Sequence, residues 1–153
     1  EPLVPSERSA GYSGTPLPRK LGIDKHALVV LIDAPRDFSR TLGALPEGAQ
    51  LRVRATRERT LTVWFCKSAR RYRAQMRAVM AALSGAPLWV AWPKQASNVE
   101  SDMSETVVRN VALAHGLVDY KVCAIDDTWS ALKFTVRDEK PVRVAAKNTS
   151  RRR

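Results

Sequence analysis

The sequence has few cysteines, few histidines and no long apolar run, and each shortage excludes a class of protein. Its two cysteines, Cys66 and Cys123, lie inside apolar runs without a Cys or His neighbour at metal-ligand spacing. This favours buried, reduced thiols over a disulfide framework or a zinc site. No apolar stretch reaches the roughly 18 to 20 residues that span a bilayer, and residues 1–20 lack the apolar core of a signal peptide. We therefore expect a cytoplasmic protein without a metal site.

Motifs of the common catalytic sites are also missing. The sequence contains no G-x-S-x-G nucleophile elbow and no P-loop. His115 beside Gly116 is typical of the end of a helix, where a cation is favoured. The Asp126–Asp127 pair is typical of a turn rather than of a carboxylate dyad. These patterns identify no catalytic residue and favour a protein that is not an enzyme.

Positive charge is what the sequence has in excess, and it is unevenly distributed. The 153-residue chain has a net charge of +11, and residues 140–153 carry six Lys or Arg and no acid. Residues 52–77 hold nine basic residues and one acid. Residues 1–20 are rich in proline, serine and glycine. We interpret 1–20 as a flexible arm, 21–139 as one folded domain, and 140–153 as a disordered basic tail.

Within the domain, apolar runs alternate with amphipathic stretches. Continuous apolar runs are typical of strands buried on both faces, and alternation of apolar and basic residues is typical of an edge strand. In chain order we predict strand 27–32, helix 36–43, edge strand 50–55, strand 60–66, helix 68–83, strand 87–92, a helix that begins at Asp102, and a hairpin of strands 117–125 and 129–137. Ser68 and Asp102 are the predicted helix N-caps, the latter with Glu105 in a capping box. The short linker 56–59 permits either a hairpin or an extended loop between its two flanking strands.

This order predicts a three-layer, Rossmann-like α/β domain, whose mixed sheet of about five to six strands ends in an antiparallel hairpin. Over residues 27–137 the pattern resembles a trimmed version of the fold of S-adenosylmethionine-dependent methyltransferases. The resemblance implies a cofactor site at a glycine-rich turn after the first strand. The turn here is Asp33-Ala-Pro-Arg36, which has no glycine and whose proline has no N–H. We therefore expect no cofactor.

Three separated segments carry a closer resemblance. They are AGYSGTPLPRKLGI (10–23), LWVAWPKQAS (88–97) and GLVDYKVCAIDDTWSALKF (116–134). These segments resemble a family of short bacterial proteins that is catalogued only as a domain of unknown function. The resemblance covers most of the predicted domain and implies a bacterial origin and a cytoplasmic location. It implies no activity.

A cationic face is the first candidate site. Arg70, Arg73 and Arg77 recur at i, i+3 and i+7 on the side of helix 68–83 away from its apolar stripe. The neighbouring strand and loop add Arg52, Arg54, Arg57 and Arg59. Such a face and a basic tail match the electrostatic footprint of nucleic-acid binding, without a motif that reads sequence. We predict a non-catalytic protein that binds RNA, DNA or an acidic protein surface; a merely solvated cationic face is the alternative.

The second candidate is a pocket at the carboxyl ends of the buried strands. If these strands are parallel, Arg36, Lys67 and Lys94 meet at one rim, beside the helix N-terminus that Ser68 opens. A phosphate or carboxylate would suit this rim. The chain would then be a small-anion or nucleotide-binding protein, or a degenerate methyltransferase-like enzyme. A third reading is an interaction module that uses the edge of strand 50–55, and the oligomeric state stays open.

Overall fold

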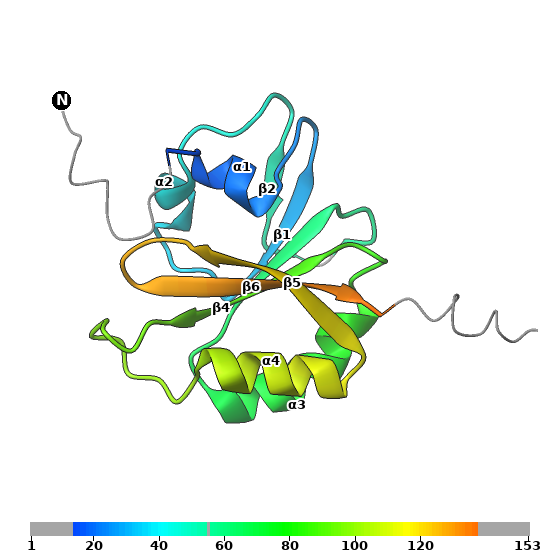
Figure 1. Ribbon diagram of the computed structural model, residues 1–153. Helices are drawn as coiled ribbons and strands as arrows, with labels where there is room; N and C mark the ends of the chain where they lie inside the picture. The colour runs from blue at the N-terminus through cyan, green and yellow to red at the C-terminus, as the bar shows by residue number, and fades with distance from the viewer. Residues whose placement is uncertain (1–13, 55, 138–153) are drawn as a thin grey trace, which may run out of the picture.

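The computed structural model describes residues 14–54 and 56–137, which form a six-stranded sheet with helices on both faces (Figure 1). The elements, in chain order, are α1 (Leu17–Leu21), β1 (Leu28–Ile32), α2 (Phe38–Leu42), β2 (Gln50–Arg52), β3 (Leu61–Phe65), α3 (Ala69–Ala81), β4 (Leu88–Pro93), α4 (Glu105–Ala114), β5 (Leu117–Ala124) and β6 (Trp129–Val136). The predicted tail 140–153 and the start of the predicted arm, residues 1–13, lie outside this description. None of the described helices is long and apolar enough to cross a bilayer.

The sheet has the strand order β2-β1-β3-β4-β6-β5. β1 pairs in parallel with β2 on one side and with β3 on the other, and β3 pairs in parallel with β4. β6 is antiparallel to both β4 and β5. The predicted α/β fold with a mixed sheet and a C-terminal hairpin is thereby confirmed. β2 and β3 flank β1 and do not pair with each other, so the linker 56–59 is part of an extended loop and not of a hairpin. β2 lies at the edge of the sheet, as predicted.

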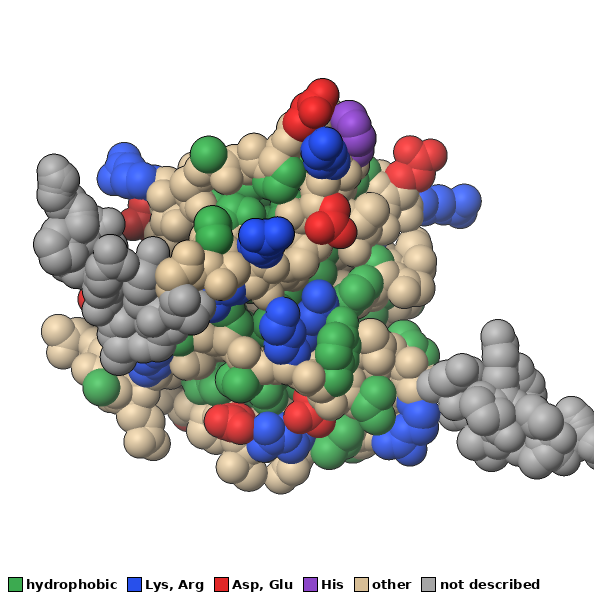
Figure 2. All heavy atoms as spheres, turned by 45° about the horizontal axis from the view of Figure 1, so that its top comes forward, with side chains coloured by type: hydrophobic (Ala, Val, Ile, Leu, Met, Phe, Trp, Pro, Cys, Tyr) green, Lys and Arg blue, Asp and Glu red, His purple; other side chains and the backbone are tan. Residues whose placement is uncertain are grey.

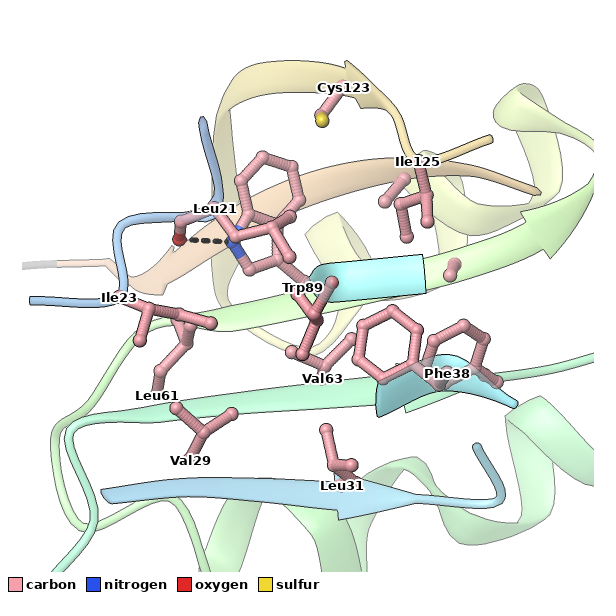
Figure 3. Close-up of a cluster of buried hydrophobic side chains, with 14 of the residues drawn as sticks. Leu21, Ile23, Val29, Leu31, Phe38, Leu61, Val63, Trp89, Cys123 and Ile125 are labelled. Atoms are coloured by element: carbon pink, nitrogen blue, oxygen red, sulfur yellow. Dashed lines mark hydrogen bonds between the residues drawn. The ribbon is translucent and has the colours of Figure 1, made fainter. Parts of the chain in front are cut away.

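One face of the sheet packs against α1 and α2, around the buried side chain of Trp89 (Figure 3). The indole Nε1 of Trp89 donates a hydrogen bond to the carbonyl oxygen of Leu21 at 2.8 Å, which ties α1 to the sheet. The proline content predicts an extended arm here, but residues 17–21 are helical. Proline is compatible with the first turn of a helix, and Gly22 ends α1 with a left-handed φ of 86°.

The other face packs against α3 and α4. α3 buries Tyr72, Met76 and Val79, the apolar stripe that its periodicity predicts. The hydroxyl of Tyr72 donates to the carbonyl oxygen of Val108 in α4 at 2.8 Å and so joins the two helices. In Figure 1, α3 and α4 lie side by side below the sheet, on the face opposite to α1 and α2.

The N-cap of α4 differs from the prediction. Ser104 caps α4, because its hydroxyl accepts the N–H of the third helical residue at 3.2 Å. The carboxylate of Asp102 instead accepts the N–H of Ala69, the first residue of α3, at 2.8 Å. The reason is that the segment before α4 runs past the start of α3, where the hydroxyl of Ser101 donates to the carbonyl oxygen of Lys67 at 2.8 Å. Asp102 therefore stabilises α3 and not the helix that follows it in sequence.

Candidate functional site

The two helical layers diverge at the carboxyl ends of β1 and β3. The chain after β1 passes to α2 on one face of the sheet, and the chain after β3 passes to α3 on the other face. In open α/β sheets, ligands bind in the crevice that this divergence creates. A pocket of about 450 Å³ lies at this position, which we call the switch-point pocket. Its lining residues are Asp33, Ala34, Trp64, Phe65, Cys66, Lys67, Ser68, Arg71, Gln75 and Trp129.

Opposite charges form a pair in the wall of the switch-point pocket. The Oδ2 atom of Asp33 and the Nη2 atom of Arg71 are 4.0 Å apart, and their side chains are 51% and 65% exposed. An ion pair this long and this exposed contributes little to stability. A ligand can therefore replace either partner at little cost in free energy. Lys67 adds a second cation and Gln75 adds an amide. The pocket can therefore bind groups of either charge.

The turn after β1 determines which ligands can approach the backbone. Asp33 has a φ of 56°, in the left-handed region that aspartate tolerates better than most residues. Ala34 and Pro35 follow, so the turn offers no glycine for close approach and no N–H at the proline. β2 ends in Arg52, about 20 residues on, where dinucleotide sites place an acid for the ribose hydroxyls. These residues do not fit a cofactor of the S-adenosylmethionine or dinucleotide type.

Aromatic rings form the apolar part of the pocket. Phe65 and Trp129 meet edge to face, with ring centroids 5.0 Å apart. Behind them, outside the lining, the ring centroid of Phe38 lies 4.9 Å from that of Phe65. Trp129 is positioned by the turn before it, in which the Oδ1 atom of Asp126 accepts the N–H groups of Thr128 at 2.9 Å and of Trp129 at 2.8 Å. The carboxylate of Asp126 therefore serves the turn, as its sequence context predicts.

Cys66 lies in the pocket wall as a buried thiol. Burial raises the pKa of the Cys66 thiol far above its ordinary value, and the nearby Asp33 carboxylate raises it further. Because the thiolate is the reactive species, this shift disfavours a nucleophilic role for Cys66. Cys66 and Cys123 are both buried and unpaired, as their apolar context predicts. The part of the chain that the structure describes contains no cluster of three metal-ligating side chains.

Two of the amides in the first turn of α3 already have partners within the protein. The hydroxyl of Ser68 accepts the N–H of Arg71 at 3.2 Å, and Asp102 accepts that of Ala69. An anion that approached this helix end would also meet the negative charge of Asp102. Ser68 therefore serves α3 itself, and an anion in the pocket depends on the side chains of Lys67 and Arg71.

Only part of the predicted anion rim comes together. Lys67 and Ser68 line the switch-point pocket, whereas Arg36 lines a neighbouring cavity of about 560 Å³ beside β2. Lys94 follows β4, is not among the lining residues of the pocket, and donates its N–H to the carbonyl oxygen of Thr128 at 2.7 Å. Arg71 supplies the cation that the sequence analysis missed. A usable signal was its place in the first turn of α3, because helical side chains lean toward the N-terminus and so toward the end of β3.

The predicted cationic face loses one member. Arg59 is buried, and its guanidinium donates to the carbonyl oxygen of Thr56 and to the hydroxyl of Thr62, each at 2.9 Å. It supplies the buried hydroxyl of Thr62 with a partner and is only 7% exposed to solvent. The other six predicted arginines are exposed: Arg52, Arg54, Arg57, Arg70, Arg73 and Arg77.

No family model and no curated protein sequence matches the chain. Solved structures do resemble it. An S-adenosylmethionine-dependent methyltransferase from Aquifex aeolicus superposes with a TM-score of 0.56 at 9% identity, over 85% of this chain and 93% of its own. A protein of the NADB-Rossmann superfamily from Streptococcus agalactiae gives a TM-score of 0.54 at 8% identity, over 84% and 71%. At these identities the likeness shows the fold alone, and it confirms the predicted Rossmann-like architecture. The resemblance to the family of unknown function stays a prediction.

Proposed function

We propose that the chain binds a small polar organic molecule in the switch-point pocket. The observation that supports this most is the pair of Asp33 and Arg71, a carboxylate and a guanidinium that line one pocket and form only a long, exposed ion pair. A ligand that separates this pair would give each group a closer partner. The position supports the proposal as well, because open α/β sheets bind ligands at the carboxyl ends of their strands, where the connections diverge.

The lining residues define the class of ligand. Arg71 and Lys67 suit a carboxylate or a phosphate, and Asp33 suits an ammonium or hydroxyl group. Phe65 and Trp129 suit an apolar ring or chain beside these groups. A volume of about 450 Å³ is within the range of small-molecule pockets. Amino acids and nucleoside monophosphates combine these features, and neither needs the glycine-rich turn that the chain lacks.

We infer binding rather than catalysis. The lining of the pocket holds one carboxylate, one thiol whose pKa is raised by burial, and no histidine. His115 lies at the end of α4, where its Nδ1 atom is 2.9 Å from the carbonyl oxygen of Val111. The site thus offers groups that hold a ligand but few that activate one. In this proposal the fold keeps the place of a methyltransferase-like ligand site without its cofactor chemistry.

Ligand-dependent thermal unfolding tests the proposal. The full chain would be melted with a panel of amino acids, nucleoside monophosphates, NAD and S-adenosylmethionine. A compound at 100 times its Kd stabilises by about 2.7 kcal/mol, which raises Tm by on the order of 8 °C. We expect an amino acid or a nucleoside monophosphate to give such a rise, and Asp33→Asn and Arg71→Gln to abolish it.

The matched control is Arg40→Gln, which alters an exposed arginine on α2 and should keep the rise. A rise that survives both pocket variants would place the ligand elsewhere. A rise with S-adenosylmethionine that exceeds all others would contradict the argument from the turn after β1. The absence of any rise across the panel would count against the proposed ligand class.

A further inference from the structure

We propose that the outer face of α3 binds the phosphate backbone of a nucleic acid, at a surface separate from the switch-point pocket. Arg70, Arg73 and Arg77 are all exposed and form one row along this face, which we call the arginine row. They lie outside the buried side of α3, where Tyr72 and Met76 contact the core. The proposal does not depend on a ligand in the pocket.

Among the residues that the structure describes, no ion pair neutralises the arginine row. α3 contains no acidic residue. Within residues 14–54 and 56–137, the ion pairs involve Arg71 and Arg109 but none of the three arginines of the row. Arg109 of α4 shows the contrast, because it contacts Glu105 at 2.7 Å and Asp119 at 3.0 Å. The unpaired row therefore distinguishes α3 from its neighbour.

The arginine row also opposes the local stability of its helix. Arg70 lies in the first turn of α3, where the positive end of the helix dipole disfavours cations. Arg70 and Arg73, and then Arg73 and Arg77, are like charges at i,i+3 and i,i+4, which repel each other. A local arrangement that disfavours the fold at several positions is expected where a function outside the fold requires it.

A nucleic acid fits the arginine row better than an acidic protein does. Protein interfaces have an apolar centre, but the exposed large hydrophobic residues among those described are Val53, Tyr120, Val122 and Val136, none of them on α3. A linear polyanion requires only regularly spaced cations, and guanidinium groups bind phosphate in a forked geometry. At 1.5 Å per residue, Arg70 and Arg77 are about 10 Å apart along the helix. That length spans roughly three phosphates of one duplex strand, at about 3.4 Å each along the axis.

The surroundings of the row indicate binding that ignores base sequence. α3 exposes no aromatic side chain for stacking on bases and no acid that would accept from a base edge. Arg57 is exposed and shares a cavity wall with Ala81 and Ala82, so it extends the row at the far end of α3. The face that carries α1 and α2 shows acidic and basic side chains interspersed (Figure 2), and it provides a control surface.

The salt dependence of binding measures the contacts directly. Fluorescence anisotropy of a labelled, mixed-sequence DNA duplex would be recorded with the full chain between about 50 and 200 mM salt. Each phosphate contact contributes about 0.9 to the slope of log K against log salt. We expect the slope of Arg70→Glu/Arg73→Glu/Arg77→Glu to be smaller than that of the unmodified chain by about 2.7. Over this range the three contacts account for a roughly 40-fold loss of affinity.

The matched control applies the same change of charge to another surface. Arg19→Glu/Lys25→Glu/Arg40→Glu alters three exposed residues on and beside α1 and α2, and its slope should stay close to that of the unmodified chain. The row variant should melt close to the unmodified chain, because glutamate at position 70 suits the first turn of α3 and the repulsion between like charges along the row is unchanged in kind. A variant with glutamine at Arg151, Arg152 and Arg153 measures what the C-terminal arginines add, and the effect of the row should persist in it.

Several outcomes would overturn the proposal. An equal decrease of the salt slope in the row variant and in the control variant would show that binding depends on net charge and not on the arginine row. Absence of duplex binding at about 50 mM salt would remove its basis. Competition by polyglutamate as strong as that by unlabelled duplex would make an acidic protein the partner. Asp33→Asn should leave duplex binding unchanged, so that failure of the pocket proposal and failure of this one are distinguishable.

Discussion

Replacing Asp102 by alanine tests how the wall of the switch-point pocket is held in place. Asp102 accepts the N–H of Ala69 at 2.8 Å, although 33 residues separate the two. Removing a side chain that caps a helix N-terminus costs about 0.5 to 2 kcal/mol, and the lost attraction between a carboxylate and the helix dipole adds about 0.3 to 1 kcal/mol. Because Asp102 is exposed, we expect the lower half of these ranges, about 1 to 1.5 kcal/mol in total.

Chemical denaturation and hydrogen exchange together provide the assay. The midpoint of urea unfolding should fall at unchanged slope, and Tm should fall by on the order of 3 to 5 °C. Exchange should accelerate at the first turn of α3, which contains Ala69, and not in α4. Ser104→Ala is the matched control and should produce the opposite pattern, because Ser104 caps α4. Faster exchange confined to α4 in the Asp102→Ala variant would refute the reasoning and restore the cap that the sequence pattern predicts.

Three other perturbations test the packing and the charges around the pocket. Trp89→Phe leaves the carbonyl of Leu21 without its buried donor and should lower the free energy of unfolding in urea by about 1 to 3 kcal/mol; a loss below about 0.5 kcal/mol would contradict this. Arg59→Ala should lower the free energy of unfolding by a similar amount, because the hydroxyl of Thr62 loses its partner, and duplex binding measured by anisotropy should stay unchanged. Unchanged stability with weaker duplex binding would place Arg59 on the cationic face. Burial in the folded state raises the pKa of Cys66 above its ordinary value of 9.0, so above that pH the unfolded chain loses the thiol proton and the folded chain keeps it. The free energy of unfolding should therefore be unaffected by this thiol below about pH 9 and should fall above it by up to about 1.4 kcal/mol per pH unit. A Cys66→Ala variant that loses stability as steeply between pH 9 and 10 would show that other groups cause the fall.

The parts of the fold that follow from local patterns were predictable. β1, β3 and β4 are continuous apolar runs, and such runs are expected in strands that are covered on both faces. α3 has a single apolar stripe and a Ser68 cap, and both signals lie within the helix itself. The alternation of apolar and basic residues around Arg52 predicted an edge strand. In the structure β2 is such a strand, because it pairs with β1 on one side only.

The remainder depends on contacts between residues far apart in sequence. The linker 56–59 has no pattern that distinguishes a hairpin from a loop, and the pairing of β1 on both sides decides it. The burial of Arg59 depends on the hydroxyl of Thr62, which no charge count reveals. The pocket pairs Asp33 with Arg71, and Lys94 is not part of it, because the loop after β4 turns toward Thr128. Local periodicity thus predicted the layers, whereas the composition of the site required the three-dimensional arrangement.

The central claim is that the switch-point pocket is the binding site. Mapping the chemical-shift changes of the protein on addition of the ligand tests it most directly. The full chain, labelled with ¹⁵N, would be titrated with the amino acid or nucleoside monophosphate that raises Tm most. The account predicts shifts of the backbone amides of Asp33, Ala34 and Lys67 and of the indole N–H of Trp129, with little change at Arg19 on α1. Shifts concentrated around Arg19, with the four pocket signals unmoved, would contradict it.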